Sequence, residues 1–303
     1  MNLLLTGAFT HDEKDALPFL KLGFERVFMM PDERGEMDFD PQKVDAIICN
    51  GLFLYRDISL FTRLKYVQLT SAGFDRVPLD EIRRRGIELK NARGVYSASM
   101  AEYAVGGVLQ LYKSFPFFDG SRREKRWEKK RDLRELSGET VCVVGAGSVG
   151  YEVAQRFKAF ETEVVGIDEY LEPRGAFDTI LPLSELDRTL TRSDIVVLTL
   201  PLTEKTYGLF GENRFAQTKT GATFINIARG ALVDEVALFN ALKSKKLSGA
   251  VLDVFTEEPL PTTSPLWDAP NVVITPHISF VSPQNSKRLF MLSLTNLKNW
   301  LLI

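Results

Sequence analysis

Short runs of apolar residues alternate with longer stretches of mixed apolar and polar residues along the whole chain. A strand that helices cover on both faces is apolar along its length, so this alternation is typical of β-α-β units around parallel sheets. The pattern predicts strands at Leu3–Leu5, Ala46–Cys49, Tyr66–Leu69, Val141–Val144, Val164–Ile167, Ile195–Leu198, Thr223–Asn226, Ala250–Leu252 and Val272–Thr275.

A long helix is expected over Ala98–Phe117, and the polar stretch Asp119–Leu136 that follows it is a candidate hinge between domains. This stretch is rich in Arg and Lys, which can indicate an anionic partner. However, Glu124, Glu128 and Asp132 are interleaved with the basic residues at helical spacing. That spacing favours a solvent-exposed helix face.

Length and composition limit the classes of protein that fit. A chain of 303 residues is expected to form about two domains, each with its own core. Apolar residues make up 45% and charged residues 26%, as in ordinary globular proteins. With 38 basic and 40 acidic side chains the net charge is -2, which argues against a nucleic-acid partner.

The N-terminus lacks the basic segment and the apolar run of a signal peptide, and no stretch approaches the roughly 18 apolar residues of a membrane span. We therefore expect a cytoplasmic protein with no membrane partner. Cys49 and Cys142 lie in apolar runs without CxxC spacing, which predicts buried thiols. The chain has only two histidines, His11 and His277, so no metal site is expected.

A glycine-rich turn, Gly145-Ala146-Gly147-Ser148-Val149-Gly150, comes directly after a predicted strand and opens a helical stretch. In a dinucleotide-binding turn, Gly145 allows the tight bend, Gly147 lets the backbone approach the pyrophosphate, and Gly150 lets the helix pack against the strand. The first turn of the helix offers free N–H groups to the phosphates.

The next predicted strand ends at Asp168, 18 residues after Gly150, where the acid that binds the ribose hydroxyls of NAD is expected. A carboxylate there repels the 2'-phosphate of NADP by roughly 1 to 4 kcal/mol. Glu169 adds negative charge, and no basic residue follows until Arg174. The motif therefore predicts NAD as the cofactor, and an ordinary glycine turn followed by a surface Asp is the alternative.

Three further segments, 226–230, 253–259 and 275–279, follow predicted strands, where a doubly wound sheet carries its ligand groups. They contain Arg229, Glu258 and His277. An Arg binds a carboxylate or carbonyl with two N–H groups, a His transfers a proton near neutral pH, and a Glu orients that His. Each residue alone has an ordinary structural explanation.

These segments read NIARGALVDEVAL (226–238), DVFTEEPLP (253–261) and TPHIS (275–279), and further matching stretches are TSAGFDRV, AEYAVGGVL, ELSGETVCVVGAGSVG and LPLTEKTYGLF. The chain thereby resembles the NAD-dependent D-isomer-specific 2-hydroxyacid dehydrogenase family. The resemblance implies an α/β fold of two Rossmann-like, doubly wound parallel-sheet domains. A cofactor domain, 93–275, is inserted into a substrate domain made of 1–92 and 276–303, with a C-terminal helix over Gln284–Leu302. It also implies a homodimer.

By the same resemblance, Arg229 binds the carboxylate and carbonyl oxygens of the substrate, His277 is the acid-base, and Glu258 keeps His277 protonated. The backbone of Ala72 and Gly73 receives the substrate carboxylate. The implied cofactor-binding residues are Gly145, Gly147, Ser148, Val149, Gly150, Asp168, Pro201, Thr206, Ile227, Ala228, Asp253 and Met100.

One position departs from the commonest family pattern. Most members have a small residue and then glycine after the catalytic histidine, whereas here Phe280 follows Ser279, which is closer to the His-x-Ala-Phe pattern of the D-lactate dehydrogenase branch. The rest of the chain does not follow that branch, because the loop at Glu257 and Glu258 keeps the commoner form. Phe280 either forms a wall of the substrate pocket near the third carbon, where it restricts substrate size, or only packs.

The sequence therefore predicts an oxidoreductase that transfers a hydride between NAD(H) and C2 of a D-2-hydroxy acid or 2-oxo acid. Reduction of a small oxo acid such as glyoxylate or hydroxypyruvate is expected, although the substrate is not fixed by the motifs. A non-catalytic NAD(H)-sensing protein of the same fold is the alternative. Formate dehydrogenase is disfavoured because the related enzymes have a Gln where Glu258 stands.

Overall fold

The computed structural model describes residues 1–7, 13–172 and 174–302. The chain divides into two compact units. The terminal unit comprises Met1–Val95 and Ser282–Ile303, and the central unit comprises Tyr96–Val281. Each unit has its own parallel sheet and its own core, which confirms the predicted α/β fold class.

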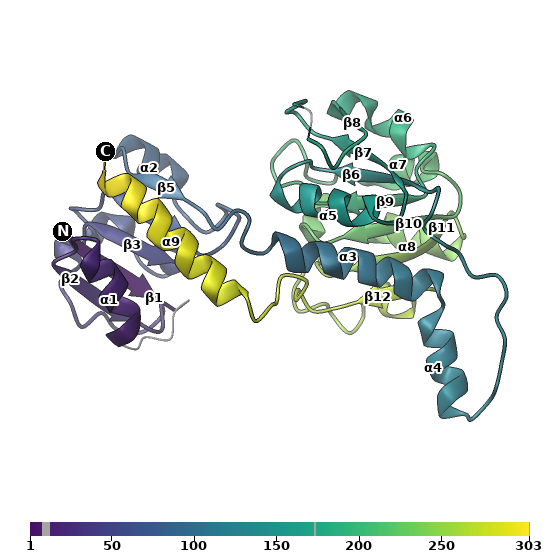
Figure 1. The fold of residues 1–303 in the computed structure, drawn as a ribbon, viewed down its shortest axis with the longest axis horizontal. Helices are drawn as coiled ribbons and strands as arrows, with labels where there is room; N and C mark the ends of the chain where they lie inside the picture. Colours follow the sequence, from purple (N-terminus) through teal and green to yellow (C-terminus); the bar gives the residue numbers. More distant parts are fainter. Residues whose placement is uncertain (8–12, 173, 303) are drawn as a thin grey trace. The chain divides into compact units, whose positions relative to one another are not determined.

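The terminal unit contains a five-stranded parallel sheet in the order β2-β1-β3-β4-β5. Its elements are β1 (Asn2–Thr6), α1 (Glu13–Lys21), β2 (Arg26–Met30), β3 (Ala46–Cys49), β4 (Tyr66–Leu69), α2 (Leu79–Arg84), β5 (Glu88–Lys90) and α9 (Asn285–Leu301). Helices α1 and α9 cover the face of the sheet that carries Leu3, Leu5 and Ile48, so the C-terminal helix packs on the first strand of the chain (Figure 1).

The central unit contains a seven-stranded parallel sheet in the order β12-β11-β10-β9-β6-β7-β8. Its strands are β6 (Thr140–Val144), β7 (Glu163–Ile167), β8 (Thr179–Leu181), β9 (Ile195–Leu198), β10 (Ala222–Asn226), β11 (Leu247–Leu252) and β12 (Val272–Ile274). The strand order reverses beside β6. In sheets of this kind, ligands bind at the carboxyl ends of the strands at such a reversal.

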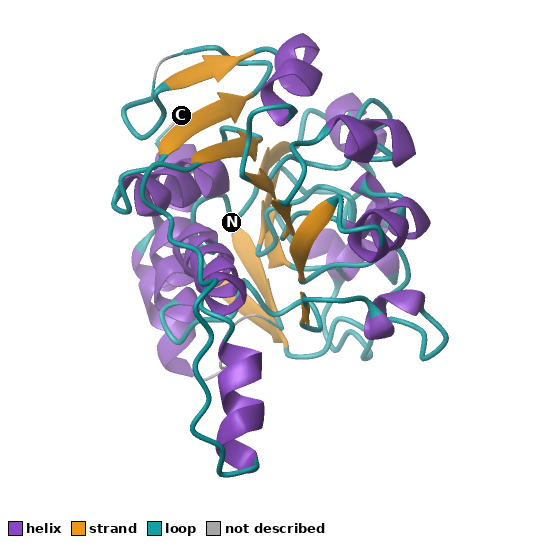
Figure 2. Ribbon diagram, turned by 90° about the vertical axis from the view of Figure 1, so that its right-hand side faces the viewer, coloured by secondary structure: helices purple, strands orange, loops and turns teal. Residues whose placement is uncertain are grey.

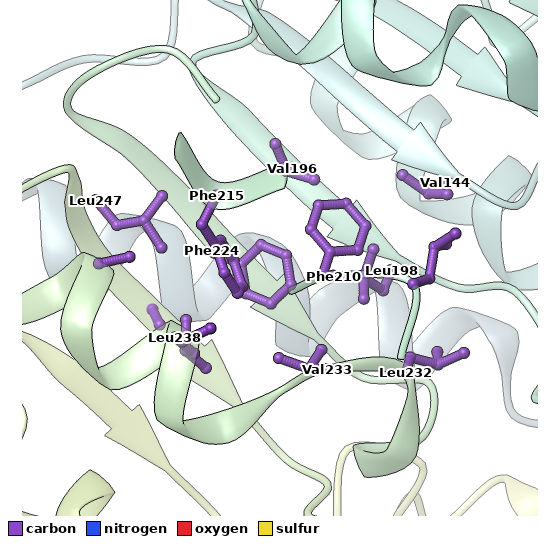
Figure 3. Close-up of a cluster of buried hydrophobic side chains, with 14 of the residues drawn as sticks. Val144, Val196, Leu198, Phe210, Phe215, Phe224, Leu232, Val233, Leu238 and Leu247 are labelled. Atoms are coloured by element: carbon purple, nitrogen blue, oxygen red, sulfur yellow. The ribbon is translucent and has the colours of Figure 1, made fainter. Parts of the chain in front are cut away.

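Helices cover both faces of the central sheet. They are α3 (Ser97–Tyr112), α5 (Ser148–Lys158), α6 (Leu186–Leu190), α7 (Glu212–Gln217) and α8 (Glu235–Lys243), and a further helix, α4 (Phe115–Arg123), follows α3. Residues of α3 and α5 pack in one apolar cluster, and residues of α6, α7 and α8 pack in the other. Phe210, Phe215 and Phe224 form the aromatic centre of the second cluster, with ring centroids 5.1 to 5.8 Å apart (Figure 3).

All the strands predicted from apolar runs are present, but β2, β5 and β8 were missed. Each of the three lies at an edge of its sheet. β5 (ELK) and β8 (TIL) have three residues each, none of them buried, so they do not show as apolar runs. β2 (RVFMM) is apolar over four residues and was overlooked.

The expected helix over 98–117 is interrupted. Helix α3 ends at Tyr112, Ser114 has a left-handed backbone (φ 51°), and α4 begins at Phe115. The predicted hinge at 119–136 is wrong, because this stretch lies wholly inside the central unit and the chain passes between the units at Val95–Tyr96 and Val281–Ser282.

Only the first part of the basic stretch is helical, since α4 ends at Arg123 and residues 125–136 follow as a turn and loop. Its charges pair locally, as expected for a solvated surface: Arg122 and Arg123 contact Asp119, and Arg126 contacts Glu124 and Glu128. Helix α4 extends away from the other helices of the central unit in both views (Figures 1 and 2).

Cys49 and Cys142 are free and fully buried, as predicted. Burial raises the pKa of both thiols, that of Cys142 to about 12. His11 lies outside the described residues. Among the helices that the structure describes, none has the length and apolar character needed to cross a bilayer.

Candidate active site

The glycine-rich turn at the end of β6 has the geometry that a dinucleotide requires. Gly145 has φ 107°, and a Cβ there would lie 2.7 Å from the backbone nitrogen of Leu200. A Cβ on Gly150 would lie 1.9 Å from the carbonyl oxygen of Gly145. A Cβ on Gly147 meets no atom within 4 Å, so the turn is open in front of the first residues of α5. A pyrophosphate fits this open position against the helix N-terminus.

Asp168 reaches this turn from the end of β7. Its carboxylate accepts hydrogen bonds from the backbone N–H of Ala146 at 2.7 Å and of Tyr170 at 3.0 Å. Arg174 donates to the carbonyl oxygen of Ala146 at 2.8 Å. The predicted ribose-binding acid and the phosphate-binding turn are therefore adjacent. The residues present fit a dinucleotide.

The other predicted cofactor-binding positions also lie in the central unit. The hydroxyl of Thr206 donates to the carbonyl oxygen of Pro201 at 2.8 Å and orders the loop after β9. Ile227 and Ala228 are buried directly after β10, and Met100 lies in the first turns of α3, partly buried against the α3–α5 cluster.

Arg229 lies in a tight turn that Asn226 holds in place. The Asn226 side chain accepts from the N–H of Ala228 at 3.1 Å and donates to the carbonyl oxygen of Arg229 at 2.9 Å. Arg229 is half-buried, and its guanidinium donates to the carbonyl oxygen of Ala228 at 2.7 Å. A Cβ on Gly230 would lie 1.9 Å from the carbonyl carbon of Phe255, so this turn packs directly against the segment that leads to Glu258.

His277 and Glu258 form a hydrogen-bonded pair, with 2.8 Å between Nδ1 and Oε2. The other carboxylate oxygen of Glu258 accepts from the N–H of Phe255 at 3.0 Å. Because a carboxylate only accepts, Nδ1 carries the proton and Nε2 is left for a ligand. The two side chains are 38% and 37% exposed, so a small molecule can reach them.

Asp253, predicted to bind the cofactor, is fully buried at the end of β11. Its carboxylate accepts from the N–H groups of Ile278 and Ser279, both at 2.8 Å. Asp253 therefore holds the loop that carries His277.

Phe280 lies beside the pair of His277 and Glu258. Its ring contacts the ring of His277 edge-to-face, with centroids 6.0 Å apart, and the ring of Tyr96 in the same way at 5.7 Å. The hydroxyl of Ser99 donates to the carbonyl oxygen of Phe280 at 2.8 Å. The Phe280 side chain is 38% exposed, so one part of it packs and another part remains accessible.

Ala72 and Gly73 lie in the terminal unit, in the loop after β4. Asn91 donates to the carbonyl oxygen of Ala72 at 2.6 Å, and Ser71 donates to that of Gly73 at 3.0 Å. Within the described part of the chain, the N–H groups of Ala72 and Gly73 donate to no other residue. They are therefore available to an anionic ligand.

Comparison with known proteins places the chain in one family. Residues 105–279 match the family model described as "D-isomer specific 2-hydroxyacid dehydrogenase, NAD binding domain". This match covers more than half of the chain. The chain belongs to the D-isomer specific 2-hydroxyacid dehydrogenase family.

Relatives in the 2-hydroxyacid dehydrogenase family carry different names. The glyoxylate reductase of Thermofilum pendens is 34% identical over 281 residues, which cover 88% of this chain and 81% of the relative. The D-3-phosphoglycerate dehydrogenase of Archaeoglobus fulgidus is 38% identical over 217 residues, or 71% of this chain. These residues span only 41% of that relative.

A solved structure of a D-isomer specific 2-hydroxyacid dehydrogenase family protein from Aeromonas salmonicida is 30% identical, with a TM-score of 0.83 over 99% of this chain and 95% of that one. The fold and family predicted from sequence are therefore confirmed.

The sequence analysis singled out the charged residues of this candidate site. It did not identify the residues that position them through hydrogen bonds. Asn226 and Thr275 lie inside the quoted motifs, so their positions were visible although their roles were not. Tyr103, which contacts Thr275, carries no local signal, because its contact depends on how α3 packs beside β12.

Proposed function

We propose that this protein is an NAD-dependent D-2-hydroxyacid dehydrogenase that acts mainly as a 2-oxoacid reductase. The observation that carries the proposal is the pair of His277 and Glu258, held in the same unit as a glycine turn and an acid that fit NAD. Bound NADH supplies the hydride that reduces C2 of the oxo acid.

The residues of the chain supply the proton and the binding contacts. Nε2 of His277 donates a proton to the C2 oxygen while C2 accepts the hydride, which gives the 2-hydroxy acid. Glu258 accepts the hydrogen bond from Nδ1 and stabilises the imidazolium form that donates. Arg229 offers planar N–H groups to the carboxylate and the carbonyl oxygen of the substrate.

We assign NAD binding to the central unit and part of substrate binding to the terminal unit. The turn 145–150 receives the pyrophosphate, and Asp168 receives the ribose hydroxyls and disfavours NADP. The positions proposed nearer the nicotinamide are Met100, Pro201, Thr206, Ile227, Ala228 and Asp253. The free N–H groups of Ala72 and Gly73 receive the substrate carboxylate.

A small substrate such as glyoxylate or hydroxypyruvate fits this proposal. The edge-to-face contact between Phe280 and His277 puts an accessible aromatic ring next to the proton donor. We therefore favour Phe280 as a wall of the pocket at the third carbon over a purely structural role. That the Thermofilum relative is named a glyoxylate reductase agrees with a small oxo acid.

We also propose a homodimer in the cytoplasm. The segment formed by α4 and the following loop exposes large apolar side chains, with Phe115 56% exposed and Trp127 95% exposed. Such surfaces usually contact another chain. Two free thiols and no disulfide among the described residues agree with a reducing compartment.

The alternative, a non-catalytic NAD(H) sensor, has less support. Arg229, Glu258 and His277 are all retained, and His277 and Glu258 are in hydrogen-bond contact. A sensor needs the dinucleotide turn but not this proton-donating pair.

The test is loss of NADH absorbance with purified protein and glyoxylate, hydroxypyruvate, pyruvate and larger 2-oxo acids. His277→Gln should lower kcat by roughly 10² to 10⁴ while NADH still binds. Turnover retained by this variant would mean that another residue donates the proton. NADH binding by the wild type without turnover on any oxo acid would support the sensor.

A further inference from the structure

Most of the backbone hydrogen bonds of the loop that carries His277 go to one residue. Three consecutive backbone N–H groups, those of His277, Ile278 and Ser279, donate to Asp253. The N–H of His277 binds the backbone carbonyl oxygen at 2.8 Å, and the next two bind the two carboxylate oxygens. The path of the loop therefore depends on the orientation of the Asp253 side chain.

One hydroxyl group binds this carboxylate directly, and a second hydroxyl binds the first. The hydroxyl of Thr275 donates to Oδ1 of Asp253 at 2.6 Å, and the hydroxyl of Tyr103 in turn contacts the Thr275 hydroxyl. Thr275 has one proton, so when it donates to Asp253 it accepts from Tyr103. The hydrogen bonds therefore run in one direction, from Tyr103 on α3 through Thr275, directly after β12, to the carboxylate of Asp253.

The hydroxyl of Tyr103 is suited to donate. Burial raises the pKa of Tyr103, so its phenol keeps its proton across the physiological range. The Asp253 carboxylate is fully buried, and in the part of the chain described by the structure it forms no salt bridge. Hydrogen bonds alone therefore orient it, and each one that is lost removes a constraint on the carboxylate.

The His277 loop needs such support because its backbone is strained. His277 has φ 53°, in the left-handed region that a residue with a Cβ disfavours. Strained residues of this kind persist where their surroundings hold them from several sides. Without these contacts, the loop can relax and move Nδ1 away from Glu258.

We propose that Thr275 and Tyr103 are positioning residues for His277. Their hydroxyls orient Asp253, Asp253 holds the backbone of residues 277–279, and that backbone sets the imidazole against Glu258. This inference deepens the proposed function and rests on it, because His277 is taken as the proton donor.

The test compares Thr275→Val, which removes the hydroxyl at nearly constant volume, with Thr275→Ser, which keeps it. We expect Thr275→Val to lower kcat with the best oxo acid by about 10- to 100-fold, because small displacements of a catalytic group are costly. The Kd for NADH should change much less than kcat, since the pyrophosphate turn is not touched. Thr275→Ser should restore most of kcat, and Tyr103→Phe should show a smaller loss than Thr275→Val.

Thr218→Val is the matched control. Thr218 is a buried threonine of the same unit, and its hydroxyl donates to the carbonyl oxygen of Arg214. The control should leave kcat unchanged. Equal losses in Thr218→Val and Thr275→Val would overturn the proposal, as would equal losses in Thr275→Val and Thr275→Ser.

A second readout does not depend on turnover. The chain has two histidines, so in a His11→Ala background the ¹⁵N spectrum of the imidazoles reports on His277 alone. We expect one set of signals with Nδ1 protonated in the parent and in Thr275→Ser, and shifted or doubled signals in Thr275→Val. Unchanged signals in Thr275→Val would refute the positioning role. If the parent lacks turnover but its spectrum responds as expected, the proposed function fails and the positioning chain stands.

Discussion

Replacement of Glu258 by glutamine isolates the contribution of one charge to catalysis. Gln has the same shape and can still accept from the N–H of Phe255, but it cannot stabilise the imidazolium of His277 by charge. The neighbouring Glu257 provides a matched control, because it carries the same charge on the same loop and is exposed.

The magnitude follows from the geometry. At the 2.8 Å that separates Nδ1 from Oε2, the interaction of two unit charges is about 1.5 kcal/mol at the dielectric constant of water and about 3 kcal/mol at half that value. Because both side chains are about two-fifths exposed, the effective value lies in this range. Glu258→Gln should therefore lower kcat for oxo acid reduction by about 10- to 150-fold.

The assay is steady-state NADH oxidation at saturating oxo acid, together with a fluorescence titration of NADH. We expect Glu258→Gln to lose kcat with little change in NADH affinity, and Glu257→Gln to behave as the wild type. If Glu258→Gln kept more than half of the wild-type kcat, the pair would not be needed for proton donation. An equal loss in both variants would show that the loop's total charge matters rather than the contact with His277.

Four further substitutions test the fold, the cofactor site and the pocket. In urea unfolding, Gly106→Ala should stabilise the protein by about 0.5 to 1 kcal/mol, because its Cβ meets open space in α3. Gly107→Ala should destabilise it by about 1 to 3 kcal/mol, because its Cβ would lie 2.6 Å from Val251; equal effects would contradict the packing. Asp168→Ala should lower the ratio of the Kd for NADPH to the Kd for NADH by about 10-fold or more, because it removes the charge that repels the 2'-phosphate. An unchanged ratio would show that Asp168 does not select between the two cofactors. Phe280→Gly should raise kcat/KM for larger oxo acids relative to glyoxylate, whereas an unchanged ranking would leave Phe280 with a packing role only.

The sequence was most informative where a short stretch of residues determines a structural element by itself. Central strands such as β6 and β9 are buried on both faces, so their all-apolar segments could be located closely. The glycine turn was readable for a similar reason. At Gly145 and Gly150 a side chain would collide with backbone atoms, so the requirement for glycine shows directly in the sequence.

Features that depend on packing between distant segments could not be predicted in this way. The end of α3 at Tyr112 is one example. Arg134 stacks on the Tyr112 ring and pairs with Glu139, so the loop that follows α4 is held against the end of α3. No local pattern in Asp119–Leu136 distinguishes such a loop from a hinge. The contact of Tyr103 with Thr275 likewise joins residues 172 positions apart.

The most direct test of the central claim is the fate of the hydride. The protein should be incubated with a prochiral 2-oxo acid and NADH deuterated at C4 on the transferred face, and the product analysed by NMR and chiral chromatography. The account predicts one deuterium at C2 of the D-2-hydroxy acid. A product without deuterium at C2, or the L enantiomer, would contradict it.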